Sequence, residues 1–419
     1  MIVNEANLAD INKNNEQLSI LTITLSLLAI FLNHSYIMFG INTSFADFFC
    51  LMALLLIINK IVIPIKYLLF FLLLSLSVLF TSTFFVPMLF SFDPGMNQVI
   101  SSYLKLVAVF LYFILGFNIA KLGFIDKILK WYSVFGLLCA IIGIIWSILK
   151  INFLSEILFF DGTRYRGFMN DPNYFSIIQI TSLAYLSRTV KTKYKFIIWT
   201  VFMLSVVVTG SKTGMITLIV YSCIRFIEYL VKMKKNIFMV SLIIIMLFII
   251  FPLIISNIHI IFHKLSIAFP SFSRIESIFI DFSSAISENG SSRDHSWKNA
   301  IYLILISPIL GIGVGTYSGL AESFFGDPTI AHNTYLQLAV EWGVPLSFIF
   351  FIYTFSILGI SYIKYRGNKI CILSDIIIIL LIGSLAISLN NARMFWLYFG
   401  ALVYSIYFKK KNCVEHHNL

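Results

Sequence analysis

Long apolar segments constrain this chain more than any other feature. A membrane-spanning helix needs about 20 mostly apolar residues, because the hydrocarbon core of a bilayer is roughly 30 Å thick. Twelve apolar segments of the sequence are candidates, at about 18–34, 41–59, 65–86, 98–120, 128–149, 173–190, 196–210, 213–231, 236–257, 334–363, 370–390 and 394–408. Only 12% of the residues are charged, against about 25% in soluble domains. We therefore expect an all-α bundle of about 12 transmembrane helices that forms a single integral membrane domain over residues 1–419.

The distribution of basic residues predicts the orientation of these helices. Cytoplasmic loops of membrane proteins are enriched in Lys and Arg. The basic connections are 60–66, 121–130, 188–195, 225–235 and 364–369, and the tail carries Lys409–Lys411. We therefore expect a multi-pass membrane protein with both termini in the cytoplasm. The net charge of +11 follows this pattern rather than forming a nucleic-acid-binding stripe, so no nucleic-acid partner is expected.

Two predicted outer segments are longer than simple connections. They are 150–172 and 258–333, and the second is expected to be a large periplasmic loop within the single domain. A short amphipathic helix is expected over Ser292–Ser307, lying at the membrane surface. After the loop, the long helix 334–363 is expected to kink near Gly343.

Two arginines precede a helix start in the first outer segment. Asp171 followed by Pro172 is typical of a helix N-terminus, and Asn173 follows them. Arg164 and Arg166 lie just upstream. The plain interpretation is a capped helix with two arginines at the membrane interface. The functional interpretation is a phosphate site, because helix N-termini and arginines both attract phosphate.

Lys212 and Arg293 occupy two further outer positions. Lys212 opens a helix after the turn Thr209–Ser211, and it either extends to the interface or binds a second phosphate. Arg293 lies one helical turn before Trp297. It either contacts lipid headgroups or binds an anionic substrate.

His332 and Lys105 are the other ionisable residues of interest. His332 precedes an inward-running helix that carries Tyr335 in its first turn. A lone His is more often structural, but the positive end of a helix disfavours the imidazolium form, and a neutral imidazole is what a general base needs. Lys105 lies inside the helix 98–120, where it either reaches the interface or binds an anionic substrate.

These features share one side of the predicted membrane. The side chains on that side are Arg164, Arg166, Lys212, Arg293 and His332. Together they predict an outward-facing site for a lipid-linked diphosphate. Neither the D-x-D nor the H-E-x-x-H signature is present. Arginines stabilise a diphosphate leaving group directly, so no metal and no other cofactor is expected.

The same residues form a recognisable series of motifs. The series is Arg164–Asn173, Gly210–Gly214, then Arg293, Trp297, Pro308, Gly311, Gly313, the run His332-Asn-Thr-Tyr-Leu-Gln-Leu, Glu341 and Gly343. It resembles the family of O-antigen ligases and Wzy-type O-antigen polymerases, with motifs over about 160–390. The resemblance implies a GT-C-type glycosyltransferase on the outer face of the inner membrane, whose donor sugar is linked to undecaprenyl diphosphate. It also implies inverting, metal-independent transfer.

The resemblance implies roles for individual residues and partners. Lys212 and Arg293, with Arg164 and Arg166, are expected to hold the diphosphate, and His332 with Arg293 to act in catalysis. The secondary candidates are Asp171, Asn173, Lys105, Trp297 and Tyr335. The expected partners are an undecaprenyl-diphosphate-linked oligosaccharide, membrane lipids and a chain-length regulator protein.

Several functions are compatible with this pattern. The ligase motif usually has Arg where this chain has Lys212, and a Lys gives a point charge rather than a two-pronged contact. The stretches Asp171-Pro-Asn and His332-Asn-Thr-Tyr-Leu-Gln also resemble those of polymerases more than those of ligases. We therefore rank a polymerase of O-antigen or capsular polysaccharide ahead of an O-antigen ligase that transfers polysaccharide to lipid A-core. A polysaccharide flippase ranks lower, because we see no paired repeat and the polar residues cluster at one surface. A non-catalytic scaffold ranks last.

Overall fold

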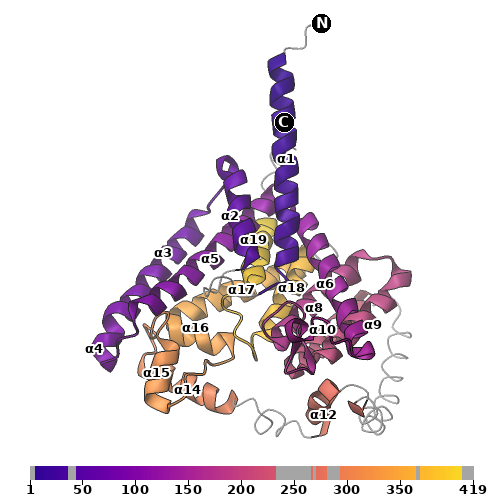
Figure 1. The fold of residues 1–419 in the computed structure, drawn as a ribbon. Helices are drawn as coiled ribbons and strands as arrows, with labels where there is room; N and C mark the ends of the chain where they lie inside the picture. Colours follow the sequence, from indigo (N-terminus) through magenta and orange to yellow (C-terminus); the bar gives the residue numbers. More distant parts are fainter. Residues whose placement is uncertain are drawn as a thin grey trace. The chain divides into compact units, whose positions relative to one another are not determined.

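The computed structural model describes residues 5–35, 44–232, 266–267, 270–280, 293–364 and 369–407. Apart from one pair of two-residue strands, its regular elements are helices, which confirms the all-α prediction (Figure 1). Within these ranges, five helices are long and apolar enough to span a membrane, namely Ile65–Phe90, Met96–Lys121, Ile125–Leu149, Lys212–Val231 and Val344–Ile363. The number twelve stays a prediction, and the expected span 236–257 lies outside the described residues.

The chain divides into two compact units, each described here by itself. The first unit comprises Met1–Phe135 and His295–Leu419, and the second comprises Gly136–Asp294. The first unit contains α1 (Glu5–Phe31), α2 (Phe45–Leu56), η1 (Ile58–Lys60), α3 (Ile65–Phe80), the π-helical η2 (Thr81–Phe85), α4 (Val86–Phe90), α5 (Met96–Lys121), α15 (Tyr317–Phe325), α16 (Thr334–Trp342), α17 (Val344–Lys364), α18 (Lys369–Gly383) and α19 (Arg393–Tyr407). Two further helices cross the unit boundaries, α6 (Ile125–Leu149) and α14 (Arg293–Ile306).

Close helix contact and an ion pair hold the centre of the first unit. Helix α19 packs along α5 (Figure 1). A Cβ atom on Gly400 would lie 2.2 Å from the Phe113 carbonyl oxygen, so only glycine permits this approach. Arg393 pairs with Asp47 of α2 at 2.5 and 2.6 Å, and the Tyr112 hydroxyl donates to the same carboxylate at 3.0 Å. These contacts tie α2, α5 and α19 together.

The prediction of one long, kinked helix over 334–363 is wrong in one respect, because two separate helices occupy this range. Helix α16 ends at Trp342, and α17 begins at Val344. Gly343 between them has φ +79°, and a Cβ there would lie 2.1 Å from the Ile309 carbonyl oxygen. The break therefore follows from the close approach of the turn around Ile309, which local sequence does not reveal.

The helix expected over Ser292–Ser307 is present as α14, but it is not merely a surface helix. Its residues Ala300 and Leu303 are buried together with Leu320 of α15 and Val86 of α4. The opposite side exposes Leu305, which is 73% accessible. This part of the predicted outer loop therefore packs into a small core that it shares with α4.

The second unit is built on three packed helices. Its elements are α7 (Ser155–Leu158), β1 (Phe159–Phe160), β2 (Arg164–Tyr165), α8 (Pro172–Thr189), α9 (Thr192–Val208), α10 (Lys212–Lys232), η3 (Pro270–Phe272) and α12 (Ser273–Ile280). Helix α8 packs against both α9 and α10. Strands β1 and β2 are antiparallel, with Phe160 opposite Arg164. At the far end of α8, Arg188 and Arg225 both pair with Glu228.

Candidate anion-binding and catalytic site

Four basic side chains come together in the second unit. Arg164 lies on β2, Lys212 is the first residue of α10, Arg274 lies in the first turn of α12, and Arg293 is the first residue of α14. Arg274 acts electrostatically on each of the other three. We call these four residues the cationic cluster. Because like charges repel, the cluster favours binding of an anion.

Arg164 is the most firmly placed member. Its side chain is buried, with the residue only 6% exposed. Its Nε donates to the Thr209 carbonyl at 3.0 Å, and its Nη2 donates to Asn173 Oδ1 at 3.0 Å. Burial first, and then the nearby Arg274, lower the pKa of the Arg164 guanidinium to about 10. The cation is therefore held in place by neutral oxygens, and it retains unfavourable interactions that a bound anion relieves.

Asp171 and Asn173 support this arrangement through the start of α8. The Asp171 carboxylate accepts hydrogen bonds from the backbone N–H of Asn173 at 2.7 Å and of Tyr174 at 2.9 Å, so the predicted N-cap is confirmed. The Asn173 side chain then accepts from Arg164. Both residues therefore position an arginine rather than presenting a free group to a ligand.

The turn before Lys212 is also built as predicted. Helix α9 ends at Val208 and α10 begins at Lys212, which confirms the turn expected at Thr209–Ser211. Ser211 Oγ accepts from the Gly214 N–H at 2.9 Å, as a helix cap does. The Thr209 carbonyl in the same turn accepts from Arg164. The turn thus brings an arginine, a lysine and a helix N-terminus into one place.

Arg293 joins the cluster from α14. One of its guanidinium nitrogens lies 3.5 Å from Thr213 Oγ1 in the first turn of α10. Burial lowers the pKa of the Arg293 guanidinium, Asp171 raises it and Arg274 lowers it. Asp171 is thus the carboxylate whose charge most favours Arg293, although its oxygens are already used to cap α8.

Arg166 has a different environment from Arg164. Its Nε donates to the Ile157 carbonyl at 3.1 Å, and its Nη2 donates to the Glu156 carbonyl at 2.9 Å. These bonds close the loop around β1 and β2. A role of Arg166 beside Arg164 in binding the diphosphate stays a prediction.

Arg274 is a member of the cluster that sequence reasoning missed. It lies within the predicted outer loop 258–333, four residues after Pro270. No motif marks it, and α12 has only eight residues. A list of every basic residue in the predicted outer loop would include Arg274. Only the fold shows that Arg274 lies near the other three cations.

His332 lies in the first unit, in a turn fixed by hydrogen bonds. Its φ of +47° is uncommon for a residue with a side chain. The next residue, Asn333, caps α16 through the N–H groups of Tyr335 and Leu336, and its Nδ2 donates to the Leu385 carbonyl at 3.1 Å. Thr334 Oγ1 donates to the Ile387 carbonyl at 2.8 Å. The segment after α18 therefore holds the imidazole-bearing turn in one conformation.

The other predicted residues of the first unit surround α16 or lie on α14. The Tyr335 hydroxyl donates to the Leu381 carbonyl at 3.0 Å. Gln337 donates to Glu341 at 2.8 Å, and Lys105 interacts electrostatically with the same carboxylate. Within the described ranges, Trp297 Nε1 is buried without a hydrogen-bond partner. The interaction with Glu341 places the Lys105 ammonium group near a carboxyl group of α16.

In the described part of the chain, no three His, Cys, Asp or Glu side chains group closely enough to hold a metal ion. The expectation that no metal or cofactor takes part stays a prediction.

One comparison with known proteins identifies part of the chain. A family model described as O-antigen ligase (Wzy_C) matches residues 196–351. That range contains Lys212, Arg274, Arg293 and His332, and it leaves out Arg164. No curated protein and no solved structure matches the chain.

Proposed function

Residues 196–351 form a domain of the O-antigen ligase family, and on this basis we propose that the protein is a polysaccharide polymerase. In this proposal it joins oligosaccharide repeat units carried on undecaprenyl diphosphate into O-antigen or capsular polysaccharide. The reaction takes place on the outer face of the inner membrane. The family match itself supports a transferase of the ligase and polymerase type that uses lipid-linked polysaccharide.

The cationic cluster is the observation that carries the proposal. A diphosphate brings several negative oxygens into a space of a few ångströms. Arg164 is buried and Arg293 is half-buried, so their attraction to an anion is less screened than at an open surface. Lys212 and Arg274 add two further charges. In the proposal these four residues bind the diphosphate of the donor.

The chemistry needs a leaving group and an acceptor for one proton. A sugar hydroxyl of the acceptor attacks the anomeric carbon of the donor, and a new C–O bond forms with inversion. The bond from that carbon to the diphosphate oxygen breaks, and undecaprenyl diphosphate leaves with the electron pair. The cationic cluster stabilises the charge that develops on this oxygen. The His332 imidazole accepts the hydroxyl proton and later returns it to water.

Other residues have supporting roles in this proposal. Asp171 and Asn173 position Arg164, and Arg166 stabilises the β1–β2 loop. Lys105, Trp297 and Tyr335 shape the surroundings of α16 and α14. A chain-length regulator protein remains an expected partner, together with membrane lipids.

Deleting the gene tests the function. Surface polysaccharide from the deletion strain is separated on a gel and compared with that from the complemented strain. A single repeat unit on its anchor, with the ladder lost, supports the polymerase. An unchanged ladder contradicts transfer of either kind.

The ligase is the second candidate, and the description of the matched family favours it. A ligase deletion gives a different result: no polysaccharide reaches lipid A-core, while full-length polymer accumulates on undecaprenyl diphosphate. Two features rank the polymerase first: the point charge of Lys212 in place of the usual Arg, and the polymerase-like stretches that begin at Asp171 and His332.

A further inference from the structure

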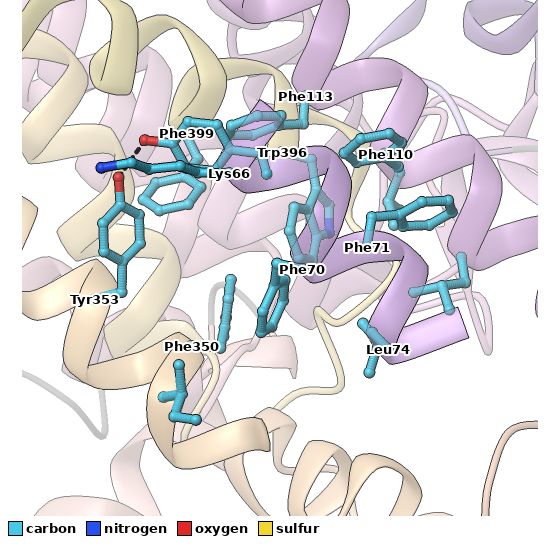
Figure 2. Close-up of a pocket in the computed structure, with 14 residues that line it drawn as sticks. Lys66, Phe70, Phe71, Leu74, Phe110, Phe113, Phe350, Tyr353, Trp396 and Phe399 are labelled. Atoms are coloured by element: carbon cyan, nitrogen blue, oxygen red, sulfur yellow. Dashed lines mark hydrogen bonds between the residues drawn. The ribbon is translucent and has the colours of Figure 1, made fainter. Parts of the chain in front are cut away.

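An aromatic groove in the first unit shares no lining residue with the cationic cluster and does not include His332. It has a volume of about 240 Å³ and is lined by side chains of α3, α5, α17 and α19 (Figure 2). Its walls are formed mainly by phenylalanines, together with Trp396. Such a surface binds an apolar chain.

The aromatic walls are fixed by contacts with one another. The rings of Phe71 and Phe110 are stacked with centroids 4.1 Å apart and planes within 1°. Phe350 lies 5.3 Å from Trp396, whose indole N–H already donates to the Asn390 carbonyl. These four side chains are therefore already ordered by their neighbours, which lowers the entropic cost of binding a ligand against them.

One end of the groove differs from the rest. Among its lining residues in the described part of the chain, Lys66 alone is charged. Figure 2 shows Lys66 and Tyr353 at the same end, and Phe71, Phe110 and Leu74 toward the other. The Tyr353 hydroxyl is hydrogen-bonded to that of Tyr67. The groove thus combines a cation and hydroxyl groups at one end with an apolar surface beyond them.

This arrangement matches a lipid with a negative headgroup. Leu74 is eight positions after Lys66 on α3, so the two residues are roughly 12 Å apart along the helix axis. This length is enough to follow part of an acyl chain. Lys66 belongs to the connection 60–66, which the charge pattern predicts to be cytoplasmic. The cytoplasmic leaflet attracts basic residues through its anionic lipids.

We propose that this groove is a binding site for an anionic phospholipid of the cytoplasmic leaflet. Its phosphate contacts Lys66, and one acyl chain lies against Phe70, Phe71 and Phe110. The polyprenyl donor is not the occupant, because its diphosphate belongs on the opposite face in the predicted topology. The site is independent of the transferase proposal, since it uses none of the residues of the cationic cluster and does not use His332.

Native mass spectrometry of the full-length protein in detergent tests this site. The protein is titrated with dioleoyl phosphatidylglycerol or with dioleoyl phosphatidylcholine at equal concentrations. We expect the anionic lipid to bind at least fivefold more tightly. Lys66→Gln abolishes this preference, whereas Lys60→Gln, at an exposed lysine of the same connection outside the groove, retains it.

A groove-filling variant separates this site from lipid that coats the protein generally. Ile349 lines the groove and is 54% exposed, so Ile349→Trp fills the space without disturbing a buried core. Loss of the tightly bound phosphatidylglycerol in this variant supports the proposal. Equal binding of the two lipids by the unmodified protein, or an unchanged preference in Lys66→Gln, overturns it. Displacement of phosphatidylglycerol by an equimolar amount of undecaprenyl phosphate also overturns it, because the groove would then serve the carrier.

Discussion

The cationic cluster and the His332 turn place their functional groups in opposite ways. Arg164 is held by two neutral oxygens but lies close to other cations, so its charge is only partly compensated within the protein. The turn around His332 is instead fixed by backbone and amide hydrogen bonds to the segment 384–389. The cationic cluster therefore attracts an anion through charge that is only partly compensated. The His332 turn instead holds its side chain on a fixed backbone. A substitution that removes charge therefore tests the cationic cluster. A substitution that changes the side chain but keeps the backbone conformation tests the His332 turn.

Removing the imidazole has the largest expected effect. His332→Asn keeps a residue that tolerates the left-handed backbone at φ +47°, but it removes the proton acceptor. Because general-base catalysis contributes about 10²–10⁴-fold, we expect kcat to fall by that factor with KM for the donor little changed. The measurement is polymerisation of purified lipid-linked repeat units by the purified protein. Activity within threefold of the unmodified protein would remove His332 from the mechanism.

Removing a shielded cation has the next largest effect. Arg293→Ala takes away one member of the cluster, and the loss of one charge-stabilising donor typically lowers kcat by about 10²–10³-fold. Lys298→Ala is the matched control, since Lys298 is exposed on the same helix α14 and should retain activity. Thermal unfolding of both variants checks that the fold is kept. Equal activities of the two variants would contradict a diphosphate site at the cluster.

Arg274 should contribute less than Arg293, because it is exposed and therefore better screened by solvent. We expect Arg274→Gln to raise KM for the lipid-linked donor about tenfold at low salt, which corresponds to roughly 1.4 kcal/mol of binding free energy. The difference should shrink at 0.5 M salt, since the Debye length then falls to a few ångströms. A salt-independent change in KM would indicate a structural role for α12 instead.

Sequence reasoning succeeded where the signal is local. Asp171 caps α8, and Lys212 opens α10 after a turn, because capping and helix breaking depend on neighbouring residues. It failed where the cause is distant. The end of α16 depends on the approach of Ile309 to Gly343, and Arg274 reaches the cluster only because α12 packs against α10.

Arg166 shows a third kind of limit. Arg166 lies two residues after Arg164 in the sequence, but its guanidinium group donates to the loop carbonyls of Glu156 and Ile157. A motif identifies which residue types are available, whereas the backbone around them decides which side chain is left to bind a ligand. The two arginines should therefore respond differently to the same substitution. Arg164→Lys should be the more damaging of the two, because Arg164 is buried within the cationic cluster, whereas Arg166 bonds to carbonyls of the β1–β2 loop.

The smallest expected effect concerns Lys212, where the chain departs from the ligase pattern. Lys212→Arg keeps the charge at the first residue of α10 and adds a planar group with more donors. If Lys212 acts on the diphosphate through its charge, activity should stay within about threefold of the unmodified protein, since the attraction to an anion is nearly the same. Lys212→Gln is the paired variant, and it should raise KM for the donor. A dead Lys212→Arg enzyme beside an active Lys212→Gln enzyme would mean that the position accepts only a compact group. The cationic cluster would then consist of the three arginines alone.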